Sequence, residues 1–352
     1  TAAFLLPALN RIIKTPAKKN KGPRILILVP TRELAMQITT QADKYSKYLN
    51  RINIACVFGG VPYHQQSRAL CKPVDILVAT PGRLIDFIDQ KKIDLSNIEM
   101  FILDEADRML DMGFIEPVEE IAGKMPETRQ TLMFSATLQG SVLNFSKRLL
   151  KDPLEVVIHA KKEKNSNITQ TLHYTDGLHH KNKILNHILS QKGVDVAIIF
   201  TATKRHADTL VLDLKDQGIR ASALHGDMNQ RQRTRTISML RSGRINILAA
   251  TDVAARGIDV QSITHVINFD LPQCTEDYVH RIGRTARAGK TGTAISFASN
   301  KDAYLVRQIE EFTGHKIDVK EIEGLEPTKK LSSNRGPARK RGSSSRGPGR
   351  RP

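Results

Sequence analysis

The sequence predicts an α/β protein built from two tandem lobes, each with a parallel β-sheet. Three observations lead to this prediction. Short apolar runs alternate with helix-length segments in the first half, a polar lysine-rich stretch interrupts them near residue 160, and the same alternation then restarts. Strands separated by helix-length segments favour parallel pairing with right-handed crossovers. The 352 residues are enough for two hydrophobic cores.

The first lobe should occupy residues 1–158. Its predicted strands are residues 24–30, 52–58, 75–79, 100–103, 131–134 and 154–158. Between them, residues 32–48 and 82–90 carry apolar side chains at helical spacing. In such sheets the functional side chains follow the carboxyl ends of the strands, which is where Pro30, Thr80, Asp104 and Ser135 fall.

The linker should be residues 159–168, because this stretch is polar and has no apolar period. The second lobe should follow at residues 169–318. Its predicted strands are residues 169–174, 196–200, 221–224, 245–249, 265–269 and 293–297. The similar size and rhythm of the two halves indicate two related lobes.

Residues 319–352 should form a basic Gly/Ser/Arg tail. From Lys329 onward nine Lys and Arg residues lie among Gly, Ser and Pro, and no acidic residue follows Glu326. Such a segment lacks the apolar residues of a core, so we expect disorder. It either attaches weakly to RNA in a salt-sensitive way or only keeps the chain soluble.

The net charge of +18 indicates a polyanionic partner, nucleic acid first; a solvated basic surface is the plainer interpretation. Three scattered cysteines without metal-ligand spacing indicate a reducing compartment, and we expect a cytoplasmic protein. No apolar run is long enough to span a bilayer. The chain starts at Thr1 rather than Met, so we expect the true N-terminus to lie upstream.

Three acids follow the apolar run at residues 100–103, namely Asp104, Glu105 and Asp107. In a phosphoryl-transfer site one acid can hold Mg²⁺ and its neighbour can orient the attacking water. A polar strand end or a helix cap is the alternative. The hydroxyls of Ser135 and Thr137, which follow the next strand, could reach Asp107 and link the two strand ends, unless they only cap a helix.

His280, Arg284 and Arg287 are spaced i, i+4 and i+7, which predicts one face of a helix. Arg281 should point elsewhere. Two guanidinium groups on one face can neutralise the charge that develops on a departing γ-phosphate. Taken alone, a basic helix would be a solvated surface. Its occurrence with the acids favours a site completed by both lobes.

Several turns after strands could bind phosphates. One strand of the second lobe is followed by Thr251, Arg256, Gly257 and Asp259. Small residues in this turn allow close approach of a ligand. Thr251 and Arg256 could meet a phosphate backbone, and Asp259 could accept a hydrogen bond from a ribose hydroxyl. In the first lobe the candidates are Pro30, Thr31, Arg32, Gly59, Gly60, Thr80, Pro81, Gly82 and Arg83. Helix N-termini expose N–H groups that bind phosphate, although each turn alone could be merely a turn.

The order of these motifs closely resembles the DEAD-box RNA helicases of superfamily two. The matching strings are PTRELA (30–35), GG (59–60), TPGR (80–83), DEAD (104–107), SAT (135–137), IIFTAT (198–203), HGD with QRQR (225–233), TDVAARGID (251–259) and HRIGRTAR (280–287). They cover nearly the whole chain to about residue 318. The stretch DEADRMLDMGF, the FGGV element and the basic tail look most like the bacterial RhlE-type subgroup.

The resemblance implies two RecA-like domains, with ATP and Mg²⁺ bound between them and RNA across both. Thr1 and Asp104 would lie on magnesium, Glu105 would polarise the attacking water, Arg284 and Arg287 would act as arginine fingers, and Gly257 and Asp259 would lie at the nucleotide. Asp107, Ser135, Thr137 and His280 would couple the lobes. Thr201, Gln230, Arg233 and Thr251 would lie along the RNA with the first-lobe turns.

The chain resembles an ATP-dependent RNA helicase that locally unwinds RNA duplexes or remodels RNA–protein complexes, in ribosome assembly or RNA turnover. Its partners would then include ribosomal precursors or RNA-decay enzymes. Thr1 would be the last residue of the phosphate loop, so the piece beginning there should be inactive alone. A non-catalytic RNA clamp and a DNA helicase of the same superfamily are the alternatives, and ATPase assays with RNA and DNA separate them. The sequence leaves the oligomeric state open.

Overall fold

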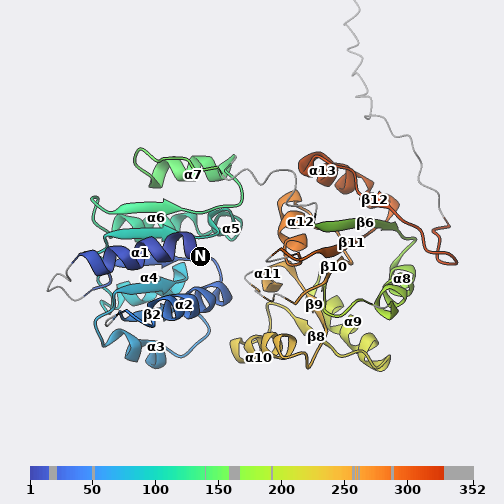
Figure 1. The fold of residues 1–352 in the computed structure, drawn as a ribbon, viewed down its shortest axis with the longest axis horizontal. Helices are drawn as coiled ribbons and strands as arrows, with labels where there is room; N and C mark the ends of the chain where they lie inside the picture. Colours follow the sequence, from blue (N-terminus) through green and yellow to red (C-terminus); the bar gives the residue numbers. More distant parts are fainter. Residues whose placement is uncertain are drawn as a thin grey trace, which may run out of the picture.

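The computed structural model describes residues 1–15, 22–49, 52–138, 140–157, 167–191, 193–255, 258, 260, 262–286 and 289–328. The chain folds into two α/β lobes that lie side by side (Figure 1). The N-terminus lies on the side of the first lobe that faces the second (Figure 1). No helix among the described residues is long and apolar enough to cross a membrane.

The first lobe contains a five-stranded sheet in the order β2-β3-β1-β4-β5. Its strands are β1 (Ile25–Leu28), β2 (Ile54–Val57), β3 (Ile76–Ala79), β4 (Met100–Leu103) and β5 (Gln130–Met133), and every pairing is parallel. The three central strands β3, β1 and β4 are buried at every position. Burial on both faces explains why they read as continuous apolar runs.

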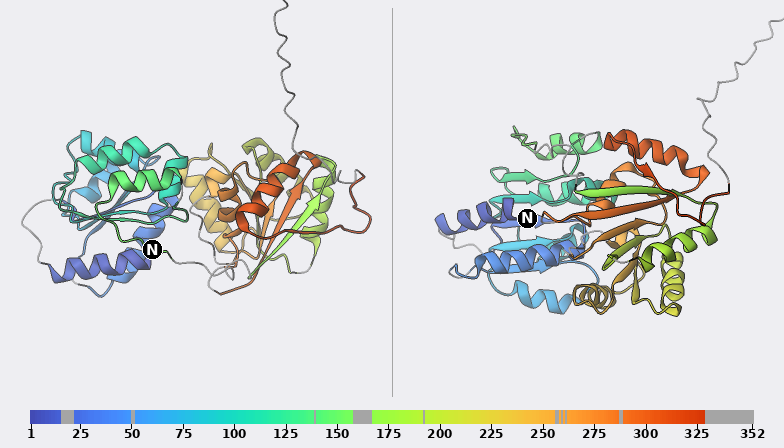
Figure 2. Two further views of the ribbon diagram at one scale, coloured as in Figure 1. Left: turned by 90° about the horizontal axis from the view of Figure 1, so that it is seen from above. Right: turned by 45° about the vertical axis from the view of Figure 1, so that its right-hand side comes forward.

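Helices cover both faces of this sheet. They are α1 (Ala2–Lys14), α2 (Arg32–Ser46), α3 (Tyr63–Leu70), α4 (Pro81–Asp89), α5 (Ala106–Asp111), α6 (Ile115–Gly123) and α7 (Ser141–Leu149). One core lies between the sheet and α1 with α2, and a second core lies under α4, α6 and α7. Seen from above, α1 lies on the opposite side of the sheet from the green helices (Figure 2).

The second lobe contains a seven-stranded parallel sheet in the order β12-β6-β11-β10-β7-β9-β8. The strands are β6 (Ile168–Tyr174), β7 (Ala197–Phe200), β8 (Ala221–Leu224), β9 (Ile247–Ala250), β10 (His265–Asn268), β11 (Gly292–Ala298) and β12 (Asp318–Val319). Its helices are α8 (Leu178–Ser190), α9 (Lys204–Asp216), α10 (Gln230–Arg241), α11 (Asp252–Ala255), α12 (Thr275–Ile282) and α13 (Ala303–Thr313), preceded by the 3₁₀ turn Asn300–Asp302. The predicted fold class, α/β with two parallel sheets, is confirmed.

Three details differ from the sequence-based expectations. The predicted strand 154–158 is wrong over its described residues 154–157, which have no strand structure; Leu154 is 89% exposed and Val156 72% exposed. β12 was not expected, because two residues are too few for a readable alternation. The folded second lobe also continues past residue 318, since Ile322 and Leu325 pack against its core. Residues 158–166 and 329–352 lie outside the described residues.

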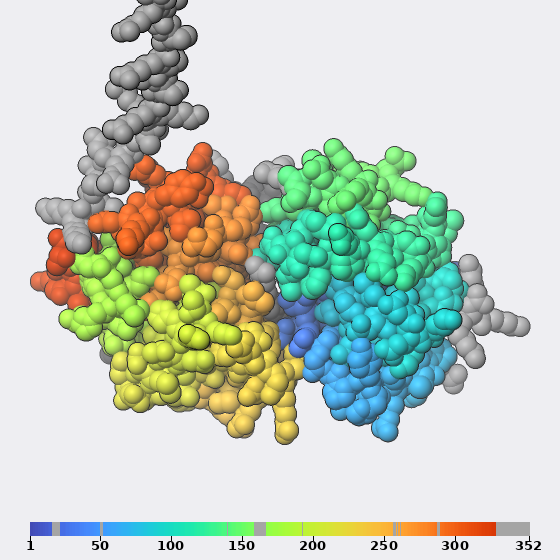
Figure 3. Space-filling view, turned by 180° about the vertical axis from the view of Figure 1, so that it is seen from behind, coloured from blue at the N-terminus to red at the C-terminus, as the bar shows by residue number. Residues whose placement is uncertain are grey.

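The first residues of two helices that follow strand ends contact the second lobe. Glu33, which lies after β1, contacts Gln230 and Arg233 of α10. Asp107, after β4, contacts His280 of α12. The space-filling view shows the two lobes as separate masses that meet along this junction (Figure 3).

Candidate functional site at the lobe junction

Asp104 and Glu105 lie where β4 ends, at the edge of the first sheet. The backbone N–H of Asp104 donates to the carbonyl of Leu28 at 3.1 Å, which extends the pairing of β4 with β1 by one residue. Its Oδ1 accepts from the N–H of Glu105 at 3.1 Å. Both side chains remain partly exposed. The strand therefore delivers two carboxylates to one spot at the junction.

Glu105 adopts a left-handed backbone conformation, with φ of 54°. A non-glycine residue pays for this conformation with roughly 1 kcal/mol or more of strain, and such residues cluster at functional sites. The following residue begins α5. The strained residue therefore lies where strand β4 gives way to helix α5.

Burial raises the pKa of Asp104 to about 6, and the neighbouring Glu105 carboxylate adds to the rise. The start of α1, at Thr1, lies near this carboxylate. The Thr1 hydroxyl makes no capping bond to its helix. Carboxylate and hydroxyl oxygens suit a hard cation such as Mg²⁺, so the donor atoms of Asp104 and Thr1 fit that ion.

Asp107 connects three elements. It is only 7% exposed, its Oδ1 accepts from the N–H of Arg108 at 3.0 Å, and its Oδ2 accepts from the N–H of Ala136 at 3.2 Å. Across the junction, Nε2 of His280 lies 3.7 Å from Oδ2. Burial alone would raise the pKa of Asp107, but the interaction with His280 lowers it below its ordinary value.

The link between the ends of β4 and β5 differs in detail from the prediction. We expected the hydroxyls of Ser135 and Thr137 to bond Asp107. In the structure the backbone N–H of Ala136 makes the bond, and the Ser135 hydroxyl instead accepts from the N–H of Thr137 at 3.3 Å. A backbone donor is fixed in direction by the turn, so this link needs no particular side-chain rotamer.

The arginine segment does not form one continuous helical face. Helix α12 ends at Ile282 with Gly283 as its cap, so Arg284 lies in the turn that follows. The Thr285 hydroxyl donates to the carbonyls of Ile263 and Thr264, at 2.7 and 3.0 Å, which holds this turn against the loop before β10. The predicted i, i+4, i+7 arrangement is therefore wrong at its second position. Arg287 lies outside the described residues.

Arg284 is nevertheless at the junction. It is 9% exposed, and its Nη1 donates to the carbonyl of Ile258 at 3.1 Å. It lines a small cavity between the lobes, with Arg108 and His280 among the other lining residues. Arg281 points elsewhere, as predicted: its guanidinium binds both carboxylate oxygens of Asp252, at 2.6 and 2.7 Å.

A second group of predicted residues gathers around Arg32 in the first lobe. Thr31 caps α2 by accepting from the N–H of Leu34 at 3.3 Å. The guanidinium of Arg32 lies against Gly59 and Gly60; a Cβ on Gly60, whose φ is +80°, would lie 2.2 Å from its Nη1. Burial lowers the pKa of Arg32, and the nearby charges of Arg233 and Arg83 lower it further.

The neighbouring turn starts α4. Thr80 precedes the helix and Pro81 occupies its first turn. Gly82 is exposed, and no atom lies within 4 Å of the position a Cβ would take. Arg83 donates to the carbonyl of Val61 at 2.9 Å and stacks 4.1 Å from the ring centroid of Tyr63. Pro30 is buried just after β1 ends, so it can fix the backbone at this edge of the sheet but offers little surface to a ligand.

In the second lobe the predicted residues have mixed environments. Thr201 is 1% exposed, and its hydroxyl donates to the carbonyl of Thr203. Thr251 is half-buried, and its carbonyl accepts from the N–H groups of Ala254 and Ala255. The predicted Arg256, Gly257 and Asp259 lie outside the described residues.

Gln230 and Arg233 make contacts that sequence reasoning missed. Both bind Glu33 of the first lobe: Arg233 Nε lies 2.7 Å and Gln230 Nε2 lies 3.3 Å from its Oε1. Arg108 similarly pairs with Asp277 across the junction. Glu33 and Arg108 stand beside residues that were predicted, within the strings PTRELA and DEADR, but nothing in a single sequence pairs a residue with a partner some 170 to 200 positions away.

Two parallel α/β lobes with acids on one side of the junction and a histidine and arginines on the other define a two-lobed, nucleotide-driven enzyme of the helicase class. Comparison with known proteins agrees. The DEAD/DEAH box helicase family model matches residues 1–145, and the helicase conserved C-terminal domain model matches residues 180–289.

The chain is 44% identical over 331 residues to the ATP-dependent RNA helicase SrmB of Haemophilus influenzae, covering 94% of this chain and 75% of that protein. It is 43% identical to SrmB of Escherichia coli, covering 95% and 76%. The chain belongs to the DEAD-box family of ATP-dependent RNA helicases.

Solved structures match both lobes at once. S. cerevisiae Dbp5 bound to RNA and ADP BeF3 is 30% identical, with a TM-score of 0.79 over 91% of this chain and 82% of that one. Mss116p bound to single-stranded RNA and AMP-PNP is 28% identical, with a TM-score of 0.81 over 92% and 69%. Because each superposition spans nearly the whole chain, the arrangement of the lobes is similar as well as the fold of each.

Proposed function

We propose that this protein separates short RNA duplexes or remodels RNA–protein complexes by closing its two lobes around ATP and RNA. The observation that carries the proposal is the set of contacts across the junction. Asp107 lies 3.7 Å from His280 within three residues of Asp104, and Arg284 lines the same cavity as His280. In the proposed closed state, the acids of one lobe and the arginine of the other would act on one phosphoryl group.

Asp104, with the Thr1 hydroxyl, would hold Mg²⁺, which when bound neutralises charge on the β- and γ-phosphates. Glu105 would orient the attacking water, since its carboxylate projects from a strained turn beside Asp104. Arg284 would stabilise charge that develops on the departing γ-phosphate. Arg287 and Asp259 lie outside the described residues; they would have the roles that the family resemblance implies, a second arginine finger and a contact to the ribose.

RNA would lie along the turns of both lobes. The gathered guanidiniums of Arg32, Arg83 and Arg233 supply positive charge, and the close approach of Gly60 to Arg32 fixes where that charge lies. Contacts of this kind fall on phosphate and sugar groups rather than base edges, so binding should tolerate many sequences. ATP and RNA should each favour the closed lobes, so each should tighten binding of the other by the same factor.

The test is an ATPase assay with RNA and DNA oligonucleotides on the full-length protein. We expect RNA, and not DNA of the same sequence, to stimulate hydrolysis. Absence of stimulation by RNA would overturn the proposal, and equal stimulation by DNA would reassign the substrate. The finer placement in the bacterial RhlE-type subgroup is also part of the proposal, and the stretch DEADRMLDMGF supports it.

A further inference from the structure

Two consecutive residues of α5 face two residues one turn apart on α12. Asp107 contacts His280, and Arg108 contacts Asp277. Residues three apart share one face of a helix, so Asp277 and His280 present a single face to the first lobe. The signs are crossed: an acid of the first lobe meets a base of the second, and a base of the first meets an acid of the second.

Arg108 is the most buried member of this set. It is 2% exposed, and its Nη1 lies against Oδ1 of Asp277, whose side chain is 16% exposed. A buried guanidinium is costly unless a carboxylate accompanies it. The cross-lobe contact therefore matters more than an exposed ion pair would, because it forms where water is excluded.

Arg108 also has a partner within its own lobe. Oδ2 of Asp111, one turn further along α5, lies 3.4 Å from the same Nη1, and this side chain is 45% exposed. If the lobes separate, Arg108 keeps Asp111 as a counter-charge. Separation therefore does not leave this buried guanidinium unpaired, so the junction can open and close.

We propose that Arg108 and Asp277 form a latch for the closed lobes, with Asp111 as the partner of Arg108 in the open arrangement. The inference rests on the proposed function, because closure around ATP and RNA is what the latch would favour. Arg108 is a positioning residue: it lines the cavity that Arg284 and His280 also line, so it stabilises the arrangement in which those residues meet the acids.

The test uses Asp277→Asn in the full-length protein, which removes the charge and keeps the shape. RNA affinity in the presence of a non-hydrolysable ATP analogue should fall about tenfold, the low end of the range for close charge pairs across interfaces. RNA affinity without nucleotide should not change, because the latch is open there. In ATPase assays KM for RNA should rise, while kcat at saturating RNA stays near the wild-type value.

Asp111→Asn is the matched control. It removes one negative charge from the same guanidinium without touching the second lobe, so RNA affinity with the analogue should stay equal or rise slightly. Asp277→Glu keeps the charge and should restore affinity. The double variant Arg108→Gln with Asp277→Asn should bind RNA no more weakly than the weaker-binding of the two single variants, because both substitutions remove the same interaction. Thermal unfolding midpoints identify any variant that fails to fold.

The outcomes separate the latch from the proposed function. If the analogue does not tighten RNA binding by the wild-type protein, the proposed function fails and the latch fails with it. If it does and Asp277→Asn keeps the full effect, only the latch is overturned. Equal losses in Asp277→Asn and Asp111→Asn would also overturn it, because Asp111 pairs with Arg108 within the first lobe and the loss could not then come from the cross-lobe pair. Failure of Asp277→Glu to recover would do the same.

Discussion

Glu33 offers the clearest test of lobe closure, because its side chain binds two residues of the other lobe. It is 7% exposed, and its Oε1 accepts from Arg233 Nε at 2.7 Å and from Gln230 Nε2 at 3.3 Å. Glu33→Gln keeps the shape and one acceptor oxygen but removes the negative charge. A hydrogen bond to a charged group contributes about 1 kcal/mol more than a neutral one. Glu33 makes one short and one longer contact of this kind, so we expect the substitution to destabilise the closed state by about 1–2 kcal/mol. This corresponds to RNA binding that is roughly five- to thirtyfold weaker.

The assay is RNA binding measured by fluorescence anisotropy, with and without a non-hydrolysable ATP analogue, in the full-length protein. The loss should be confined to the nucleotide-bound condition. Glu127→Gln is the control, since that side chain is 89% exposed and pairs only with Lys151 among the contacts found in the described residues. An equal loss without nucleotide would refute the reasoning, because Glu33 would then act on RNA binding by the first lobe alone.

Four further predictions follow from other parts of the chain. Glu105→Gln should trap ATP and RNA with little turnover, measured by γ-phosphate release; unchanged turnover would refute the role of Glu105. Gly60→Ala should displace Arg32, whose Nη1 would lie 2.2 Å from the new Cβ, and should weaken RNA binding in filter assays. Deleting residues 329–352 should lower RNA affinity and flatten its dependence on salt; an unaltered slope would show that the tail does not bind RNA. Asp270→Asn should lower the free energy of unfolding at pH 7 by about 2 kcal/mol, in chemical denaturation, and the difference should vanish at low pH.

The pH dependence at Asp270 has a definite sign. Burial alone would raise its pKa, but His206, Lys181 and the N–H of Ala202 lower it far below the ordinary value. A carboxylate whose pKa is lower in the folded than in the unfolded state adds stability above the unfolded pKa of about 3.9, and loses it as pH falls toward the folded pKa. The wild-type advantage over Asp270→Asn should therefore decline below about pH 4. A constant difference from pH 7 to pH 2 would contradict this.

The fold could be predicted because parallel strands buried on both faces leave a plain signal. β1, β3 and β4 are four-residue apolar runs bounded by polar turns, and each was found within a residue or two. The segment at residues 154–157 carries the same kind of side chains but is exposed. An apolar run does not show whether a sheet edge is available to pair with it, so this strand could not be excluded from sequence.

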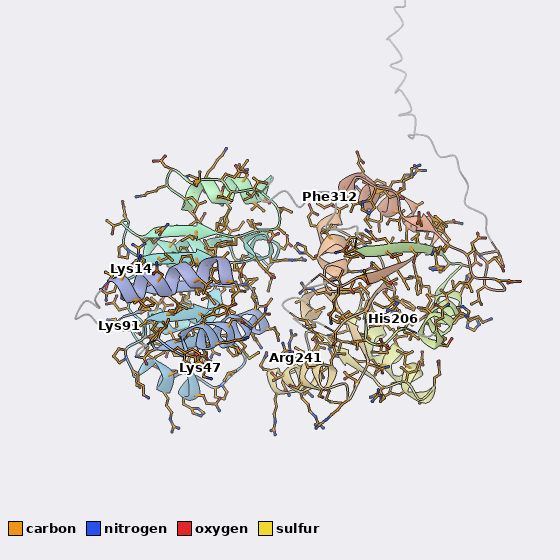
Figure 4. The ribbon with its side chains drawn as sticks, in the orientation of Figure 1. Lys14, Lys47, Lys91, His206, Arg241 and Phe312 are labelled. Atoms are coloured by element: carbon orange, nitrogen blue, oxygen red, sulfur yellow. The ribbon has the colours of Figure 1, made fainter. Side chains whose placement is uncertain are left out.

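In the candidate site, the position of the acids was predicted better than the contacts between the lobes. The position of the acids after β4 followed from the pattern, because the strand itself sets it. The end of α12 before Gly283 could not be predicted, because the helical spacing of basic residues continues in the sequence after the helix has ended. The cross-lobe partners of Glu33 and Arg108 also could not be found, because the relative placement of two lobes leaves no periodicity in either one. Figure 4 shows the side chains of both lobes and labels Arg241. This residue ends α10, the helix that contains Gln230 and Arg233.

The most direct measurement is single-turnover ATP cleavage by the full-length Arg284→Lys variant at saturating ATP and RNA. Lysine keeps the charge but lacks the planar fork of donors. Since arginine fingers accelerate phosphoryl transfer by about 10³–10⁵-fold, we expect cleavage to slow by at least about a hundredfold while ATP and RNA still bind. Cleavage at the wild-type rate would contradict the claim that a guanidinium from the second lobe completes the site of the first.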